Sequence, residues 1–194
     1  MGCTGTPVLG NPNCLSCAVT TPIPGDVRYT VNGATRSVAQ RFVASKKCIS
    51  SIQLYTVSKY GADLLVEIRS DTSSSTGPVP LGSPGSSNGL IDSQLISSSV
   101  ISSSGLFTIT FNPPLQAPTT GVYYHLVFSS NGKCLTLGKH DGTLNTIDSA
   151  YNTSIYPVAG AAPNYWQDLL DVLIFGIYFQ DYSCLPQCGG FTIS

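Results

Sequence analysis

The sequence predicts an all-β fold, a jelly-roll-like antiparallel β-sandwich with a cysteine-bearing N-terminal arm and C-terminal tail. Runs in which apolar and polar residues alternate recur along the chain, and this alternation indicates strands with one buried face. Clusters of Ser, Gly, Pro and Asn separate the runs, as turns do in sandwiches and jelly rolls. No long stretch has the helical period, although residues 165–170 suit one helical turn.

The first half of the chain contains several predicted strands and one long loop. Residues 28–31, 38–44 and 49–57 are predicted strands, and the polar turn 45–47 joins the last two. Residues 64–69 form the next predicted strand, from which Leu65, Glu67 and Arg69 are expected to face outward. Residues 71–89 are rich in Ser, Gly and Pro, which predicts a long surface loop.

The second half contains the clearest strand signals. Residues 95–101 are a predicted strand, and residues 106–111 and 122–128 are predicted to form a hairpin around a Pro/Thr/Gly connection. The apolar faces of these two strands are expected to hold Phe107, Ile109 and Phe111, and Val122, Tyr124, Leu126 and Phe128. Residues 135–138 and 147–156 are weaker strands, and the very apolar run 172–179 is predicted to be central.

These segments divide the chain into three parts. Residues 1–26 are predicted to be an extended arm with Cys3, Cys14 and Cys17, residues 27–180 the β-sandwich domain, and residues 181–194 a tail with Cys184 and Cys188. A chain of 194 residues is long enough for one domain with one core.

The composition excludes several classes of partner. Charged residues make up 10% of the chain and the net charge is −1, so no basic surface for nucleic acid or anionic lipid is expected. The apolar run 169–179 contains Asp171 and is too short to span a membrane as a helix, so no membrane insertion is predicted. The start of the chain shows no secretory signal. A surface of Ser, Thr, Gly, Asn and Pro suits exposure outside the cell or packing into an assembly.

Two cysteine pairs lie near opposite ends of the sequence. Cys14 and Cys17 are separated by two residues, and Cys184 and Cys188 by three. Because chain termini are often neighbours, four thiolates from two such pairs suit a structural zinc ion. Disulfides between arm and tail, or free thiols, are the alternatives, and the odd count of 7 leaves one cysteine over. Cys48 and Cys134 are expected to be small buried side chains. A disulfide between them is an open alternative.

No motif predicts catalysis. The two histidines are His125, inside an alternating strand, and His140, in a polar segment, and no metalloprotease, nucleophile-elbow or phosphate-loop motif occurs. Glu67 is the only glutamate, which leaves little material for a pair of catalytic carboxylates. We therefore predict a non-enzymatic protein without catalytic residues.

Three aromatic residues are candidates for carbohydrate binding. Trp166, Tyr165 and Tyr151 have flat rings of the kind that stack on the apolar faces of sugar rings. The alternative is that Trp166 fills one end of the core or a subunit interface.

The order of motifs over roughly residues 38–179 resembles a widespread jelly-roll module of bacterial surface and carbohydrate-binding-like proteins and of tailed-phage virion proteins. The matching segments are Gln40-Arg41-Phe42, residues 49–55, residues 64–69, Pro84-Gly85, residues 107–111, Pro114-Leu115, residues 121–127 and residues 171–178. The resemblance implies a jelly-roll fold and a structural or binding role, because its motifs are mainly structural.

Taken with the low charge, the resemblance predicts a structural component of an extracellular assembly. The preferred interpretation is a phage virion protein, either a capsid decoration or a tail-associated subunit, located in the virion as a homo-oligomer that contacts other virion subunits. The alternatives are a carbohydrate-binding or adhesion module of a bacterial surface protein, which would bind glycans at the cell surface, and a self-assembling surface-layer or filament subunit.

Overall fold

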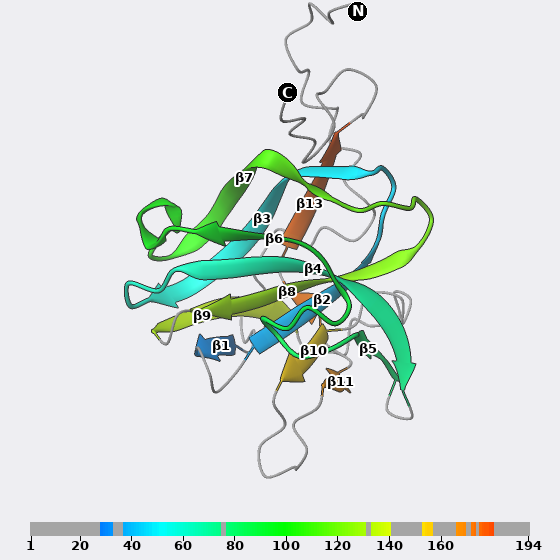
Figure 1. The fold of residues 1–194 in the computed structure, drawn as a ribbon. Coiled ribbons are helices and arrows are strands. Elements are labelled where there is room, and N and C mark those ends of the chain that lie inside the picture. The colour runs from blue at the N-terminus through cyan, green and yellow to red at the C-terminus, as the bar shows by residue number, and fades with distance from the viewer. Residues whose placement is uncertain are drawn as a thin grey trace, which may run out of the picture.

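The computed structural model describes residues 28–32, 37–74, 77–130, 133–140, 153–156, 166–169, 172–173 and 175–180 (Figure 1). In this part of the chain the protein is all-β, and its one helical element is the 3₁₀ turn η2 (Ser98–Val100). The strands are β1 (Arg28–Asn32), β2 (Ser37–Val43), β3 (Cys48–Lys59), β4 (Leu64–Ser74), β5 (Gly77–Pro80), β6 (Leu90–Ile96), β7 (Gly105–Gln116), β8 (Tyr123–Ser130), β9 (Cys134–His140), β10 (Thr153–Tyr156), β11 (Gln167–Leu169), β12 (Val172–Leu173) and β13 (Phe175–Gln180).

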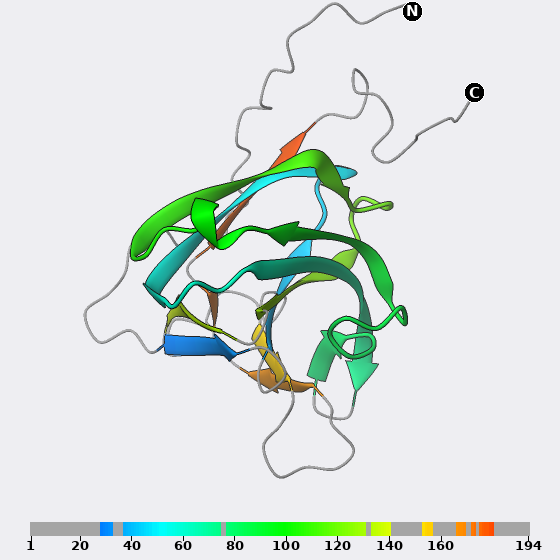
Figure 2. The ribbon, with the colours of Figure 1, turned by 60° about the vertical axis from the view of Figure 1, so that its left-hand side comes forward.

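The strands form two antiparallel sheets, named here the β3 sheet and the β4 sheet. In the β3 sheet, β3 pairs with β7 along one edge and with β13 and then β9 along the other, and β9 also pairs with β1 and β12. In the β4 sheet the order is β11-β10-β2-β8-β4, and β4 pairs first with β6 and then with β5. Figure 2 shows β4 bending along its length toward β5, so this sheet is curled.

Both sheets contribute to one apolar core. Alternate residues of β3, such as Ile52 and Leu54, are buried, and alternate residues of β8, such as Leu126 and Phe128, belong to the same cluster. Phe42 on β2 stacks obliquely on Tyr124 of β8, with ring centres 6.0 Å apart. Each large apolar side chain buried in this way stabilises the fold by about 1.5–3 kcal/mol. The predicted face of residues 106–111 is confirmed, because Phe107, Ile109 and Phe111 are all buried.

Three predictions about how the segments are arranged are wrong. Residues 106–111 and 122–128 form no hairpin, because β7 pairs with β3 while β8 pairs with β2 and β4 in the other sheet. Residues 71–89 are only partly loop, since β4 continues to Ser74 and β5 returns beside it. The run 172–179 is not a central strand: among the described strands, β13 pairs with β3 alone and β12 with β9.

The loop 81–89 lies over the outer face of the β4 sheet and is bound there by a buried ion pair. Glu67 and Arg69, both on β4, are almost completely buried rather than facing solvent, and their side chains meet at 2.9 Å. The Arg69 guanidinium donates to the carbonyls of Leu81, Ser86 and Asn88, at 3.1, 2.7 and 2.8 Å. The N–H of Gly85 donates to the Glu67 carboxylate. These hydrogen bonds tie the loop 81–89 to β4 at four positions.

We expect Gly89→Ala to lower the free energy of unfolding by about 2 kcal/mol. Gly89 has φ +73°, and a Cβ there would lie 2.5 Å from the carbonyl oxygen of Leu81. Gly85→Ala is the matched control, because Gly85 has φ +75° but open space around its Cβ position, so it should lose only about 1 kcal/mol. Urea unfolding measures the free energy of unfolding of both variants. Equal losses of stability would contradict the predicted steric clash between a Cβ at position 89 and Leu81.

Candidate functional site

Four side chains on the outer face of the β4 sheet form a polar group that we call the Asp71 cluster. Arg41 comes from β2, Asp71 from β4, and Tyr123 and His125 from β8. The sheet register places Arg41 opposite His125, and His125 opposite Arg69. Asp71 follows Arg69 by two residues and so points to the same face. Antiparallel pairing thus gathers residues that are distant in the sequence.

The Asp71 carboxylate is the centre of the cluster. Arg41 donates from Nε to Oδ1 at 3.0 Å and from Nη2 to Oδ2 at 2.8 Å, a two-bond geometry that fixes the plane of the carboxylate. His125 Nε2 lies 2.6 Å from Oδ1. The guanidinium carbon of Arg41 also lies 3.8 Å from the ring centre of Tyr123, in a cation–π contact. Arg41 is therefore held on two sides.

The protonation states of the cluster follow from burial and these contacts. Burial lowers the pKa of His125 below its ordinary 6.5, although the hydrogen bond to Asp71 and the charge of that carboxylate act in the opposite direction. Burial would raise the pKa of Asp71, but hydrogen bonds from His125 and Arg41 hold it below its ordinary 3.8. At neutral pH the histidine is neutral, and because a carboxylate only accepts, its proton is on Nε2.

The second ring nitrogen of this histidine is unusual. His125 Nδ1 is buried and makes no hydrogen bond in the described part of the chain. A buried acceptor without a partner costs about 1–3 kcal/mol, so His125 is present at the expense of stability. The single ion pair of the cluster is thus Arg41–Asp71, with His125 as a neutral donor.

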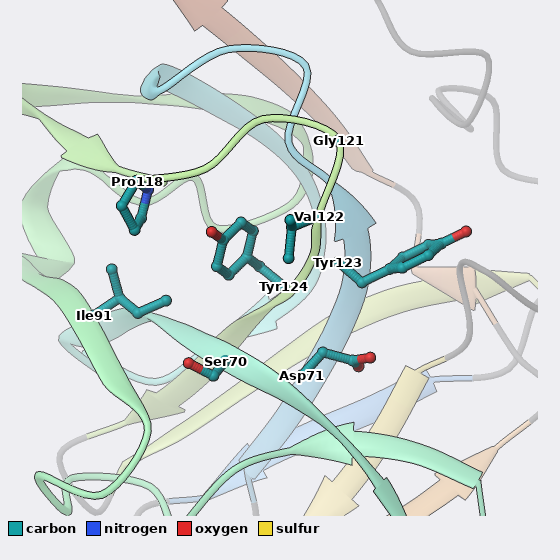
Figure 3. Close-up of a pocket in the computed structure, with 8 residues that line it drawn as sticks. All are labelled: Ser70, Asp71, Ile91, Pro118, Gly121, Val122, Tyr123 and Tyr124. Carbon is teal, nitrogen blue, oxygen red and sulfur yellow. The ribbon is translucent and has the colours of Figure 1, made fainter.

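A groove of about 590 Å³ opens beside the cluster, where β4 and the start of β8 diverge. Figure 3 shows Ser70, Ile91, Pro118 and Tyr124 on one side of β4, while Asp71 and Tyr123 point to the opposite side. Tyr124 is fixed because its hydroxyl accepts the N–H of Thr119 at 3.1 Å. The complete lining of the groove is Ser70, Asp71, Ile91, Pro118, Gly121, Val122, Tyr123 and Tyr124.

Of the three aromatic candidates, the structure describes Trp166. Its side chain is 5% exposed and packs on Tyr156, with ring centres 5.2 Å apart. The indole N–H donates to the carbonyl of Gly82 at 2.6 Å, which ties Trp166 to the loop 81–89. Trp166 therefore has a packing role in this arrangement, and carbohydrate binding through it stays a prediction. Tyr165 and Tyr151 lie outside the described residues.

The structure describes two of the seven cysteines. Cys48 is buried, as expected, and is disulfide-bonded. Cys134 is a free cysteine, which excludes a bridge between the two, and it is only partly buried. Cys14, Cys17, Cys184 and Cys188 lie outside the described residues, and zinc or disulfides at these positions stay predictions. The described residues contain no group of three or more ligating side chains that suits a metal ion.

Sequence reasoning missed Arg41 and Asp71 as site residues. Arg41 was part of a predicted strand and Asp71 the first residue of a predicted loop, so neither was a candidate. One signal was available: charges are scarce in this chain, yet Glu67, Arg69 and Asp71 occur at alternate positions and so share one face of a strand. Scarce charges on one strand face indicate a paired polar cluster.

No protein-family model matches the chain, and no curated protein matches it. Among the described residues there is no helix with the length and apolar character that spanning a membrane requires.

Proposed function

We propose that the chain is a non-enzymatic jelly-roll β-sandwich that serves as a structural component of an extracellular assembly. The preferred assembly is a phage virion, in which the protein acts as a capsid decoration or tail-associated subunit. In this role it forms a homo-oligomer and contacts other virion subunits.

The observation that supports this proposal is an exposed apolar end. Tyr60, Leu95 and Val100 are 70%, 64% and 62% exposed. They come from neighbouring segments, the β3–β4 turn, β6 and η2, because Lys59 donates to the carbonyl of Ser98 and Asp63 accepts the N–H of Ser98, which holds η2 against the β3–β4 turn. Large apolar side chains exposed together are typical of a contact surface. We name these three residues the apolar end and assign it to contact with a second copy of the chain.

The placement of charge is consistent with assembly. Glu67, Arg69, Arg41 and Asp71 are paired with one another on the outer face of the β4 sheet and are largely withdrawn from solvent. Few charges then remain for the rest of the surface of a chain in which 10% of residues are charged. The centres of protein interfaces are depleted of charge, because burying an unpaired charge is costly.

Substitution of the apolar end tests the contact. We expect the unmodified protein to be an oligomer in light scattering coupled to size-exclusion chromatography, and Leu95→Lys with Val100→Lys to be monomeric. The melting temperature of the double variant should lie within about 2 °C of that of the isolated unmodified subunit, because exposed positions contribute little to stability. Ser93→Lys, at another exposed position of β6, is the control and should leave the oligomer intact.

Immunogold labelling and mass spectrometry of purified particles test whether the protein is part of a virion. The proposal expects the protein in the particle fraction of its source culture. A monomer that is absent from every particle would overturn it. Polymers formed by the purified chain alone would favour a filament or surface-layer subunit instead.

A further inference from the structure

A small layer of residues covers part of the outer face of the β4 sheet and is separate from the main core. Val79 of β5 and Trp166 pack on Ala39 and Val127, and these four residues form a buried apolar cluster of their own. Figure 1 shows β5 near β10 and β11, on the side of the β4 sheet away from β7. The loop 81–89 belongs to the same layer, because one of its carbonyls accepts the indole N–H of Trp166. We call the loop 81–89, Val79 and Trp166 the outer layer.

The outer layer has less to stabilise it than the core has. Its apolar cluster contains four buried residues, whereas the main cluster is much larger and extends over both sheets. Hydrogen bonds from Arg69 to three carbonyls of the loop, and from Trp166 to a fourth, add to its attachment. Regions with few buried apolar contacts open at a lower free-energy cost than the whole fold. The outer layer can therefore open while both sheets stay intact.

His125 lies next to the outer layer on the same face of the sheet. It precedes Val127 by two residues on β8, so the two side chains share this face. The imidazole is completely buried, and its Nδ1 makes no hydrogen bond in the described part of the chain. Protonation of Nδ1 would bury a positive charge and a second N–H without an acceptor. The closed arrangement therefore disfavours the imidazolium, and access of water favours it.

The charges around His125 act in the same direction. The sheet register places it between two arginines, one on β2 and one on β4, and each already has a carboxylate partner. The two pairs are Arg41 with Asp71 and Arg69 with Glu67. A third positive charge in this row would outnumber the carboxylates. The nearby Tyr123 and Tyr156 add phenol groups, which are neutral in acid, and the loop 81–89 and β5 contain no titratable residue.

We propose that protonation of His125 opens the outer layer in mild acid, so that the loop 81–89 and Trp166 separate from the β4 sheet while both sheets persist. Burial lowers the pKa of His125 in the closed form, and an open form that exposes the imidazole regains the ordinary 6.5. The open form therefore takes up a proton that the closed form does not. Each pH unit below 6.5 then favours opening by up to about tenfold. This inference does not depend on the proposed role in assembly.

Trp166 is the only tryptophan of the chain, so its fluorescence reports on the outer layer directly. The protein is titrated from pH 7.5 to pH 4.5, and tryptophan emission and its quenching by acrylamide are recorded beside far-UV circular dichroism, which reports on the sheets. We expect the emission to move to longer wavelength and the quenching to increase at a pH where the dichroism is unchanged. A simultaneous change of both signals would show global unfolding and would overturn the proposal, as would unchanged fluorescence down to pH 4.5.

Two histidine variants identify the titrating group. His125→Gln does not titrate, so its tryptophan emission should stay constant over the whole range. His140→Gln removes the other histidine of the chain and is the matched control, which should show the transition of the unmodified protein. The proposal fails if His125→Gln retains the transition or if His140→Gln abolishes it.

Hydrogen exchange of the unmodified protein decides the question even if His125→Gln does not fold. The amides of Leu81, Gly85 and Ser86 are hydrogen-bonded in the closed form and report on the loop 81–89. Their protection factors should fall by up to about tenfold per pH unit below 6.5, while those of β3 and β7 fall less. Equal losses of protection in the loop and in these strands would overturn the proposal.

Discussion

Arg69→Met is expected to lower the free energy of unfolding by about 3–5 kcal/mol, because it leaves a buried carboxylate without its partner. Glu67 and Arg69 are both inaccessible to solvent, and Arg69 also donates to three carbonyls of the loop 81–89. In a chain of this size such a loss corresponds to a fall in melting temperature of about 10 °C. Calorimetry and urea unfolding measure it directly.

Two further variants test whether the unpaired carboxylate of Glu67 causes this loss of stability. Adding Glu67→Gln to Arg69→Met removes the unpaired charge, so the double variant should be more stable than the single one. Arg41→Met breaks a more accessible ion pair and should lose only about 1 kcal/mol. The explanation fails if Arg69→Met loses less than 1 kcal/mol, or if the double variant is no more stable than Arg69→Met.

The second large effect is a loss of stability in mild acid. The pKa of His125 is lowered in the folded state, so below pH 6.5 the unfolded chain takes up a proton that the folded chain does not. Stability is therefore fully present above pH 6.5 and falls as the pH drops, with a slope that approaches 1.4 kcal/mol per pH unit until the folded state is also protonated. Asp71, with a lowered pKa, adds a further loss only below pH 3.8.

Urea unfolding at half-unit steps from pH 7.5 to pH 4.5 is the measurement. His125→Gln retains an amide N–H that can donate to Asp71 but does not titrate, so its stability should be nearly flat between pH 6.5 and pH 5. His140 is present in both chains, and the difference between them isolates His125. Parallel curves for the two chains would show that His125 is not the source of the acid sensitivity.

The local part of the fold could be predicted from the sequence. Side-chain direction alternates along any strand, so the buried faces of β3, β7 and β8 were evident from residues such as Ile52, Phe107 and Leu126. Pairing is not local, and so the hairpin between residues 106–111 and 122–128 was wrong: the connection crosses from one sheet to the other. The short strand β5 was hidden among Gly and Pro residues that usually indicate a loop.

Local pattern could indicate only the alternating charges on β4, and not the residues that meet them in the candidate site. Asp71 is 30 residues from Arg41 and 54 from His125 in the sequence, and only the order β2-β8-β4 brings them together. Trp166 shows that a residue type alone does not predict a role. Its residue type suggested a sugar-stacking platform, and the structure adds what the sequence could not show, namely that its indole N–H donates to the carbonyl of Gly82 and that its side chain is 5% exposed.

The sheet order also constrains how the protein is made. β2 and β3 are synthesised early, yet their partners β10 and β13 lie more than a hundred residues later in the sequence. The β4 sheet cannot be completed on the ribosome until residue 169 has left the exit tunnel, and the β3 sheet cannot be completed until residue 180 has left it. Until then β2 and β3 have unpaired edges, the condition in which strands associate with other chains. We therefore expect folding to be slow, and a nascent chain that ends before β13 to require protection from aggregation.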